Sequence, residues 1–209
     1  SDLLSYNNIL YAATEGGGVF QSTNMGQVWT ALNDGLLNFE IYSLAFNDAG
    51  IFAATGGGQV YMKPHGSNTW ENKGMVFGGE PVWVLENLNG NIYAGSNFGN
   101  IAFTGDNGTT WNDINAFPST IFTIAMVNNL LYAGTQEVGI IASDDLGGSW
   151  NVKNTGLKVA PVNKIIGYQN KPIAGLEGEG VFFSENDGAS WTGINDGLND
   201  LNITTLAVI

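Results

Sequence analysis

Apolar residues occur along this chain in short runs of strand length, and each run ends at a cluster of glycine, asparagine or aspartate. Residues 41–74 show the pattern most clearly, because four such runs follow one another there. These runs are Ile41–Phe46, Ile51–Thr55, Gln59–Lys63 and the more polar Thr69–Lys73. Short runs between turn residues predict an antiparallel meander of four strands. No window keeps a period of 3.6 residues for more than a few positions, so the sequence predicts no helix.

The same plan recurs at a fixed spacing. An eight-residue phrase follows the third run of each repeat and ends in tryptophan, at Trp29, Trp70, Trp111, Trp150 and Trp191. These tryptophans are 41, 41, 39 and 41 residues apart. A period near forty, with four strands in each period, is typical of a β-propeller.

The fold class expected is therefore all-β: a five-bladed β-propeller of four-stranded antiparallel blades, forming a single domain over residues 1–209. The N-terminal part starts with a second run, Ile9–Thr14, and lacks a first run, whereas Ile203–Ile209 at the other end matches a first run. We expect this C-terminal strand to complete the first blade and close the ring, which would remove exposed sheet edges.

The recurring phrase has the form S-x-[D/N]-x-G-x-[S/T]-W and resembles the Asp-box, or BNR repeat. Its best copies are Ser143–Trp150 and Ser184–Trp191, followed by Thr104–Trp111 and Ser22–Trp29. Proteins with this repeat include sialidases, sortilin-type receptors, xyloglucanases and many secreted bacterial proteins. The resemblance implies a β-propeller in which these turns lie on the face opposite the ligand site.

Residue chemistry suggests a structural role for this turn. The Asp or Asn can accept hydrogen bonds from backbone N–H groups of its own turn, the glycine suits a positive φ, and the tryptophan packs beneath the turn. The acceptors are Asn24, Asp106, Asp145 and Asn186, and the glycines are Gly26, Gly108, Gly147 and Gly188. We therefore expect none of these residues to be catalytic. The second copy has Lys63, His65 and Ser67 at the key positions and should form the poorest turn.

Charge and composition exclude several functions. The chain has 19 acidic residues against six basic ones, all lysine, which gives a net charge of −13. Without a cationic patch, neither nucleic acid nor an anionic membrane surface is an expected partner. There is no cysteine and only one histidine, His65, so a thiolate or histidine metal site is not expected. We expect no cofactor, since even a calcium site lacks its D-x-D-x-D-G signature.

The best candidate ligand site lies on the face that carries the turns between second and third strands. Aligned first strands place one residue of each at an equivalent position: Tyr42, Trp83, Phe122, Asn163 and Thr204. The three aromatic rings among them could stack on sugars. The acidic candidates on the same face are Glu15, Glu40, Glu80 and Glu177. The alternative interpretation is that the aromatic residues only pack between blades and that the acids are solvated loop charges.

Three functions fit these observations. The first is a non-enzymatic binding module, a carbohydrate-binding (lectin-like) or adhesive domain of a secreted or cell-surface bacterial protein. The second is a glycoside hydrolase that uses two of the carboxylates, although not a sialidase, because that family holds its substrate with arginines and this chain has none. The third is a scaffold for protein–protein interaction. A monomer with a glycan or protein ligand is expected.

Overall fold

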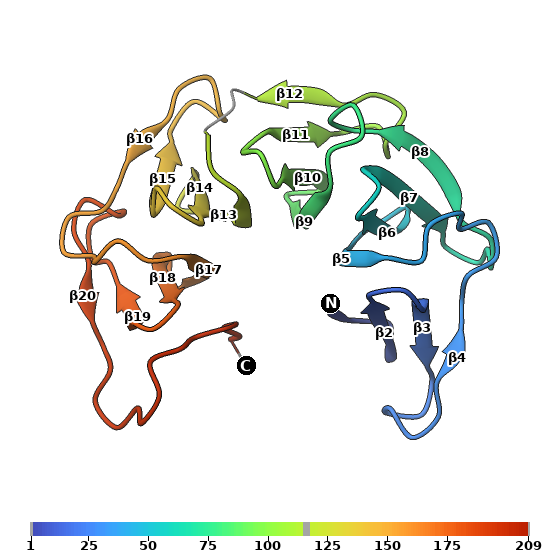
Figure 1. Ribbon diagram of the computed structural model, residues 1–209, viewed down its shortest axis with the longest axis horizontal. Helices are drawn as coiled ribbons and strands as arrows, with labels where there is room; N and C mark the ends of the chain where they lie inside the picture. The colour runs from blue at the N-terminus through green and yellow to red at the C-terminus, as the bar shows by residue number, and fades with distance from the viewer. Residues whose placement is uncertain (1, 115–117, 209) are drawn as a thin grey trace. The chain divides into compact units, whose positions relative to one another are not determined.

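The computed structural model describes residues 2–114 and 118–208 of the chain, and Figure 1 shows its strands. The described residues contain no helix, so none could cross a membrane as a helical span. They form five sheets, each of four antiparallel strands taken in chain order. The structure therefore confirms the expected all-β fold of five four-stranded propeller blades.

The blades follow the repeat seen in the sequence. Blade 1 consists of β1 (Leu3–Tyr6), β2 (Ile9–Thr14), β3 (Gly18–Ser22) and β4 (Thr30–Ala31). Blade 2 consists of β5 (Ile41–Asn47), β6 (Gly50–Thr55), β7 (Gln59–Pro64) and β8 (Glu71–Met75). Blade 3 consists of β9 (Val82–Leu88), β10 (Asn91–Ser96), β11 (Ile101–Thr104) and β12 (Asn112–Ile114). Blade 4 consists of β13 (Ile121–Val127), β14 (Leu130–Thr135), β15 (Ile140–Ser143) and β16 (Asn151–Val152). Blade 5 consists of β17 (Val162–Tyr168), β18 (Lys171–Leu176), β19 (Gly180–Phe183) and β20 (Thr192–Gly193).

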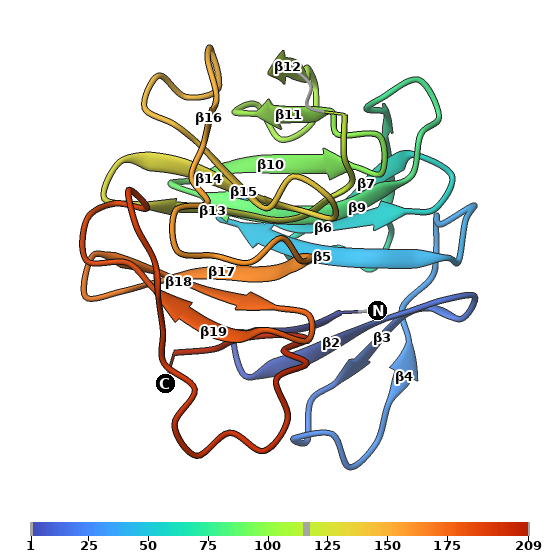
Figure 2. The same cartoon turned by 60° about the vertical axis from the view of Figure 1, so that its left-hand side comes forward.

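Two compact units divide the chain. Unit 1 contains Ser1–Asn97 and Ile101–Asp113, and unit 2 contains Phe98–Asn100 and Ile114–Ile209. Within unit 1, β5 of blade 2 lies beside β9 of blade 3, and within unit 2, β13 lies beside β17 (Figures 1 and 2). Strand β6 of blade 2 is buried on both faces from Gly50 to Thr55, because blades 1 and 3 of the same unit pack on either side of it.

Polar side chains hold neighbouring first strands in register. In unit 1, the backbone N–H of Leu85 donates to Ser43 Oγ at 3.1 Å, and that of Leu44 donates to Asp2 Oδ2 at 2.9 Å. In unit 2, Ile165 N–H donates to Thr123 Oγ1 at 3.2 Å. Ser43 and Thr123 occupy the same position of β5 and β13, and Asp2 lies just before β1. Each of these acceptors bonds the first strand of the next blade.

The two chain ends differ from the sequence-based expectation. Blade 1 has its own first strand, because Leu3–Tyr6 pairs with Ile9–Ala12, so the prediction that it lacks one was wrong. The sequence pattern missed it because Leu3 is exposed and the run is short and mixed.

Residues 203–208, the described part of the expected C-terminal strand, form no assigned strand. They lie beside blade 5, where Ile203 N–H donates to Leu176 O at 3.3 Å and Asn163 Nδ2 donates to Ile203 O at 2.9 Å. Since blade 1 already has four strands, it does not need this segment for completion. Closure of the ring by strand pairing stays a prediction.

Candidate functional site

The tryptophan turns, Ser22–Trp29, Thr104–Trp111, Ser143–Trp150 and Ser184–Trp191, share one hydrogen-bond pattern. In the third of them, Ser143 Oγ donates to Asp145 Oδ1 at 2.7 Å and accepts from Gly147 N–H at 2.7 Å. Asp145 Oδ1 also accepts from Ser149 N–H at 2.8 Å. The four glycines of these turns have φ between 75° and 98°, as expected from the sequence. The acidic and amide side chains of the turns are therefore used to shape the backbone.

The two aspartates of these turns are held in their charged form. Asp106 accepts from the backbone and hydroxyl of Thr110 and from the hydroxyl of Thr104, and these bonds lower its pKa to about 2. The hydroxyl of Ser143, with the backbone and hydroxyl of Ser149, lowers the pKa of Asp145 to about 2. A carboxylate with such a pKa suits neither general-acid catalysis nor proton transfer near neutral pH.

The turn of blade 2, Lys63–Trp70, follows a different plan. Lys63 is buried, and its Nζ donates to Ser67 O at 2.9 Å, so the ammonium bridges the turn that a hydroxyl bridges elsewhere. Burial lowers the pKa of Lys63. His65 stacks on Tyr6 with ring centroids 4.9 Å apart, and one of its ring nitrogens lies 3.0 Å from Asn47 O. The only histidine is thus part of the packing between blades 1 and 2.

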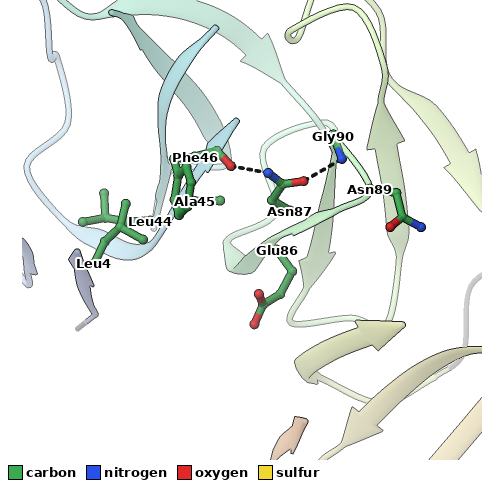
Figure 3. Close-up of a pocket in the computed structure, with 8 residues that line it drawn as sticks. All are labelled: Leu4, Leu44, Ala45, Phe46, Glu86, Asn87, Asn89 and Gly90. Atoms are coloured by element: carbon green, nitrogen blue, oxygen red, sulfur yellow. Dashed lines mark hydrogen bonds between the residues drawn. The ribbon is translucent and has the colours of Figure 1, made fainter. Parts of the chain in front are cut away.

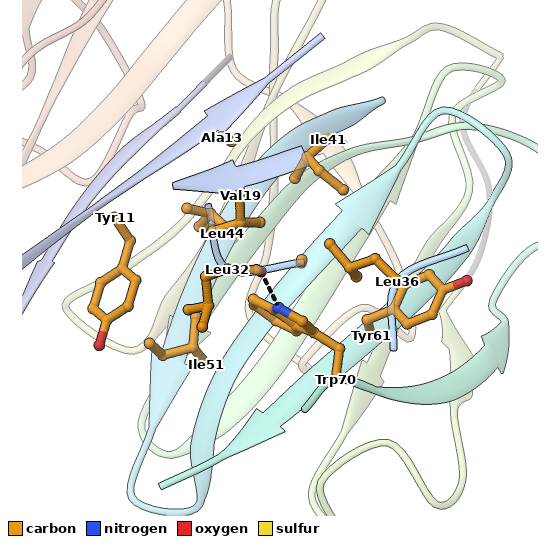
Figure 4. Close-up of a cluster of buried hydrophobic side chains, with 11 residues drawn as sticks. Tyr11, Ala13, Val19, Leu32, Leu36, Ile41, Leu44, Ile51, Tyr61 and Trp70 are labelled. Carbon is orange, nitrogen blue, oxygen red and sulfur yellow. Dashed lines mark hydrogen bonds between the residues drawn. The ribbon is translucent and has the colours of Figure 1, made fainter. Parts of the chain in front are cut away.

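Two of the tryptophans are fixed by the preceding blade of their own unit. The indole N–H of Trp70 donates to Leu32 O at 2.7 Å (Figure 4), and its backbone N–H donates to Asp34 O at 2.8 Å. Trp191 repeats both bonds in unit 2, to Lys153 O and Thr155 O. Asp34 and Thr155 lie in short loops with the sequence Asn-x-Gly-Leu. Leu32 and Lys153 are the residues just before these loops.

We call this loop the NxGL loop; it occurs at Asn33–Leu36, Asn154–Leu157 and Asn195–Leu198. Its asparagine side chain fixes it to its own blade, as Asn154 shows by accepting from Ile140 N–H and donating to Val138 O. The sequence analysis missed this motif because its glycine and asparagine read as ordinary turn residues. Blades 2 and 3 lack it, and the indole N–H groups of Trp111 and Trp150 find no partner among the described residues.

The aligned positions Tyr42, Trp83, Phe122 and Asn163 are all β-bulges. The register of each first strand shifts by one residue there, between Ile41 and Ser43 in β5 and at the corresponding point in β9, β13 and β17. A bulge turns a side chain away from the regular pleat and is common beside binding sites. The structure therefore confirms the equivalence for these four positions, whereas Thr204, the fifth aligned residue, lies in no assigned strand.

Tyr42 and Trp83 meet in unit 1 as a stacked pair. Their ring centroids are 4.6 Å apart and the rings are inclined by only 9°. Tyr42 Oη donates to Glu40 Oε1 at 2.8 Å. That bond, with burial and the negative charges of Glu40 and Glu15, raises the pKa of Tyr42 to about 12. After stacking, Trp83 keeps 38% of its surface exposed.

Backbone hydrogen bonds gather the acidic residues around this pair. Glu15 and Glu40 form an isolated antiparallel bridge, and Gly56 N–H donates to Glu40 O at 3.0 Å. The Glu40 carboxylate lies so close to Gly56 that a Cβ there would be 2.4 Å from Oε2. The backbone of Glu80 lies against Gly58 in the same turn. Tyr42, Trp83, Glu15, Glu40 and Glu80 thus all belong to unit 1.

The other two candidates belong to unit 2. Phe122 is the half-buried bulge residue of β13, and Glu177 is an exposed residue in the turn between β18 and β19. Glu177 N–H donates to Pro161 O at 2.9 Å, so this turn, like its equivalents, lies beside the segment that enters its blade.

A cavity of about 430 Å³ opens elsewhere in unit 1, near the other end of β5 and β9. Figure 3 shows its lining, with Glu86 beside Asn87 and with Leu4 and Leu44 on the opposite side. Asn87 is already used, because it donates to Phe46 O and accepts from Gly90 N–H. Within residues 2–114 and 118–208, no three histidine, cysteine or acidic residues stand close enough together to hold a metal ion.

Comparison with known proteins identifies the fold. No protein family and no curated protein matches the sequence. Among solved structures, the extracellular domain of a putative one-component system from B. thetaiotaomicron, BT4673, is similar with a TM-score of 0.74 and 12% identity over 95% of this chain and 28% of that chain. PorZ, a surface component of the type-IX secretion system of Porphyromonas gingivalis, has a TM-score of 0.72 and 14% identity over 99% of this chain and 35% of that chain.

YCF48 bound to a D1 peptide has a TM-score of 0.58 and 18% identity over 81% of this chain and 58% of that chain. The chain spans less than two thirds of the length of each of these three neighbours. The neighbours are β-propeller-like, and identities this low carry the fold alone. Their names describe an extracellular domain, a bacterial surface component and a peptide complex.

Proposed function

We propose that this chain is a non-enzymatic carbohydrate-binding module and that Tyr42 and Trp83 form its sugar-stacking platform. The observation that carries the proposal is the exposed indole of Trp83, stacked on Tyr42 at two adjacent β-bulges beside carboxylates. Sugar rings present C–H groups that pack on aromatic faces, while carboxylates accept hydrogen bonds from their hydroxyls. The tryptophan turns, which resemble Asp-boxes, serve as structural elements in this proposal.

The polar surroundings suit hydroxyl recognition. Tyr42 keeps its proton over the whole physiological range, because its pKa is about 12, so its hydroxyl fixes one oxygen of the Glu40 carboxylate. The other oxygen can accept from a ligand. The Tyr42 ring is thereby held in place before a ligand arrives, which reduces the entropy lost on binding. A secreted or cell-surface location belongs to the same proposal, since two of the neighbours are an extracellular domain and a surface component.

A glycan array followed by titration calorimetry tests this function. The wild-type chain should bind at least one glycan class, and Trp83→Ala should weaken that binding at least tenfold. Glu40→Gln should weaken it less, because an amide oxygen still accepts from hydroxyls. The matched control is Trp29→Ala, which removes a tryptophan of equal exposure, 37% against 38%, outside this site. Equal binding by Trp83→Ala and wild type would refute the proposal.

Chromogenic glycosides, incubated with the same proteins, separate a lectin from a glycoside hydrolase. Two carboxylates about 5–10 Å apart would be needed for hydrolysis. Hydrolysis by the wild-type chain that is lost in Glu15→Gln or Glu40→Gln would favour the glycoside hydrolase over the lectin. Binding without turnover supports the lectin.

Recognition of a basic peptide is a second candidate, favoured by the acidic residues around the aromatic pair. Glu15 and Glu40 lie beside Tyr42, and the chain carries a net charge of −13. A lysine or arginine side chain could stack on Trp83 and pair with these carboxylates. Peptide binding that falls steeply with salt, together with a silent glycan array, would favour this candidate over the lectin.

A further inference from the structure

The backbone around Glu40, beside the stacked pair of Tyr42 and Trp83, is fixed by two blades. The N–H of Glu40 donates to Asn38 Oδ1 at 2.8 Å, and its carbonyl accepts from Gly56 N–H at 3.0 Å in blade 2. The preceding carbonyl, that of Phe39, accepts from Gly16 N–H at 2.9 Å in blade 1. Glu40 is thus held between the turns that join the second and third strands of blades 1 and 2.

The carboxylate of Glu40 is fixed as well. Tyr42 Oη donates to Glu40 Oε1 at 2.8 Å. A Cβ on Gly56 would lie 2.4 Å from Glu40 Oε2 and 3.0 Å from Tyr42 Oη, so a glycine at this position leaves the room that the pair occupies. The carboxylate is therefore held beside the Tyr42 ring, whose centroid lies 4.6 Å from that of Trp83.

These contacts all lie within unit 1. Glu40 and Tyr42 belong to the entry of blade 2, Trp83 to β9 of blade 3, and Glu15 to the turn that follows β2 of blade 1. The geometry of this group is therefore complete in three consecutive blades, and it uses no residue of unit 2.

The site has negative charge that the lysines of unit 1 do not offset. Glu15 and Glu40 lie on opposite sides of one antiparallel bridge. Unit 1 contains two lysines and no arginine. Lys63 is bonded inside its own turn, and Lys73 pairs with Glu71 at 3.0 Å. Neither lysine pairs with Glu40, so a ligand with a positive group would supply the counter-charge.

We propose that the ligand of this site is an amino sugar with a free ammonium group, whose ring packs on Trp83 and whose ammonium pairs with Glu40. The inference rests on the proposed carbohydrate-binding function and names the class of sugar. An ammonium makes a charge-assisted hydrogen bond with a carboxylate, roughly twice as strong as a bond between neutral groups. N-acetylation removes the charge and leaves one neutral N–H, so it removes this advantage.

The rigidity of the site favours a sugar over a lysine side chain. An amino sugar carries its nitrogen directly on the ring, so its apolar face and its ammonium keep a fixed separation. The indole of Trp83 and the carboxylate of Glu40 are also held in place, by stacking and by the bonds described above. A lysine side chain would lose rotamer freedom to match them, which costs affinity.

Titration calorimetry at low ionic strength tests the inference with two oligomers that differ only in acetylation. Wild type should bind a glucosamine oligomer of the chitosan type about fivefold more tightly than its fully N-acetylated counterpart. Glu40→Gln should bind both equally and keep the wild-type affinity for the acetylated oligomer, which also shows that it is folded. Gly56→Ala should likewise lose the preference, because its Cβ displaces the carboxylate. Glu71→Gln is the control, since it changes the net charge equally but outside the site, and should keep the preference.

The outcomes separate this inference from the function on which it rests. Equal affinity of wild type for the two oligomers, with Trp83 still required, would overturn the amino-sugar assignment and leave carbohydrate binding intact. A preference that Glu40→Gln retains, or that Glu71→Gln also loses, would assign it to the overall charge of −13 and overturn it too. Silence toward both oligomers and the whole glycan array would remove the carbohydrate function and this inference together. Binding of a lysine-containing peptide that requires Trp83 would then favour the basic-peptide candidate.

Discussion

Trp29 and Trp70 end the same turn in neighbouring blades, yet they differ in burial. Trp70 is 2% exposed and donates two hydrogen bonds to the loop after β4, whereas Trp29 is 37% exposed. The turn cannot be the cause, because the Trp29 turn has the regular hydrogen bonds and the Trp70 turn does not. Within unit 1, Trp70 bonds the NxGL loop of blade 1, and the residues of unit 1 offer Trp29 no second loop of this kind.

The comparison separates two roles of the repeat. The side chains of the tryptophan turn shape the hairpin between third and fourth strands within one blade. The indole instead connects blades, and its contribution depends on what the neighbour offers. Trp191 agrees with Trp70 in unit 2, since it is buried and bonded to Lys153 O. Trp111 also packs against the apolar cluster that blades 2 and 3 share, but without an NxGL loop its indole N–H has no partner among the described residues. The NxGL loop therefore adds hydrogen bonds to a joint that the tryptophan makes by packing.

The largest expected effect comes from truncating the tryptophans themselves. Trp70→Ala should lower the free energy of unfolding by about 3–5 kcal/mol, because it leaves a cavity and an unpaired Leu32 carbonyl. Trp29→Ala should cost less than about 1 kcal/mol, as expected for an exposed side chain. Urea unfolding followed by circular dichroism at low protein concentration measures both. Similar losses of unfolding free energy for the two variants would show that burial of the indole between blades does not determine its contribution to stability.

The glycines of the NxGL loops give the next largest effect. Gly156 and Gly197 have φ of 88° and 85°, so alanine is strained equally at both. A Cβ at Gly156 also lies 2.2 Å from Trp191 O, whereas Gly197 has open space. Gly197→Ala should cost about 1 kcal/mol and Gly156→Ala about 3 kcal/mol. Thermal unfolding of the two variants compares them within one unit, and equal shifts would mean that the bound turn adds no constraint.

Much of this fold follows from the sequence because its signals are local. Strand runs between turn residues and the spacing of the tryptophans predicted five four-stranded blades, and aligned first strands correctly made Tyr42, Trp83 and Phe122 equivalent. The β-bulge at these positions gave no separate signal, because one extra residue leaves the apolar pattern unchanged.

Interactions between segments distant in sequence were less accessible. β1 was missed because Leu3–Tyr6 has one exposed leucine and no clear alternation. The stacking of Tyr42 on Trp83 joins residues 41 positions apart, and the contact of Glu15 with Glu40 joins two loops. The exposure of Trp29 could not be read from its own turn at all, since it depends on the neighbouring blade. Sequence reasoning therefore found which residues share a position, and the structure was needed to show which of them meet.

Replacing the asparagine of an NxGL loop tests how much the loop itself contributes to stability. Asn154→Ala loses the bonds to Ile140 N–H and Val138 O and should cost about 2 kcal/mol. Asn195 makes the equivalent bonds to Val181 N–H and Glu179 O in the blade 5 loop, against which no turn of unit 2 packs, so Asn195→Ala should cost nearly as much. Urea unfolding of both variants checks this. A much smaller loss for Asn195→Ala would show that the loop depends on a bound turn for its shape.

The smallest expected effect comes from removing the negatively charged carboxylates of the tryptophan turns. Asp106 and Asp145 have a pKa of about 2 in the folded chain, below the usual 3.8, so they stabilise the fold above about pH 4 and lose that contribution as pH falls toward 2. Asn24 and Asn186 accept the same backbone bonds without a charge. The double variant Asp106→Asn/Asp145→Asn should therefore fold normally and show a shallower fall of its thermal midpoint between pH 4 and pH 2. Because both carboxylates are exposed, the thermal midpoint of the double variant should differ little from that of wild type at pH 7. A midpoint that falls as steeply between pH 4 and pH 2 as in wild type would assign the acid sensitivity to other carboxylates.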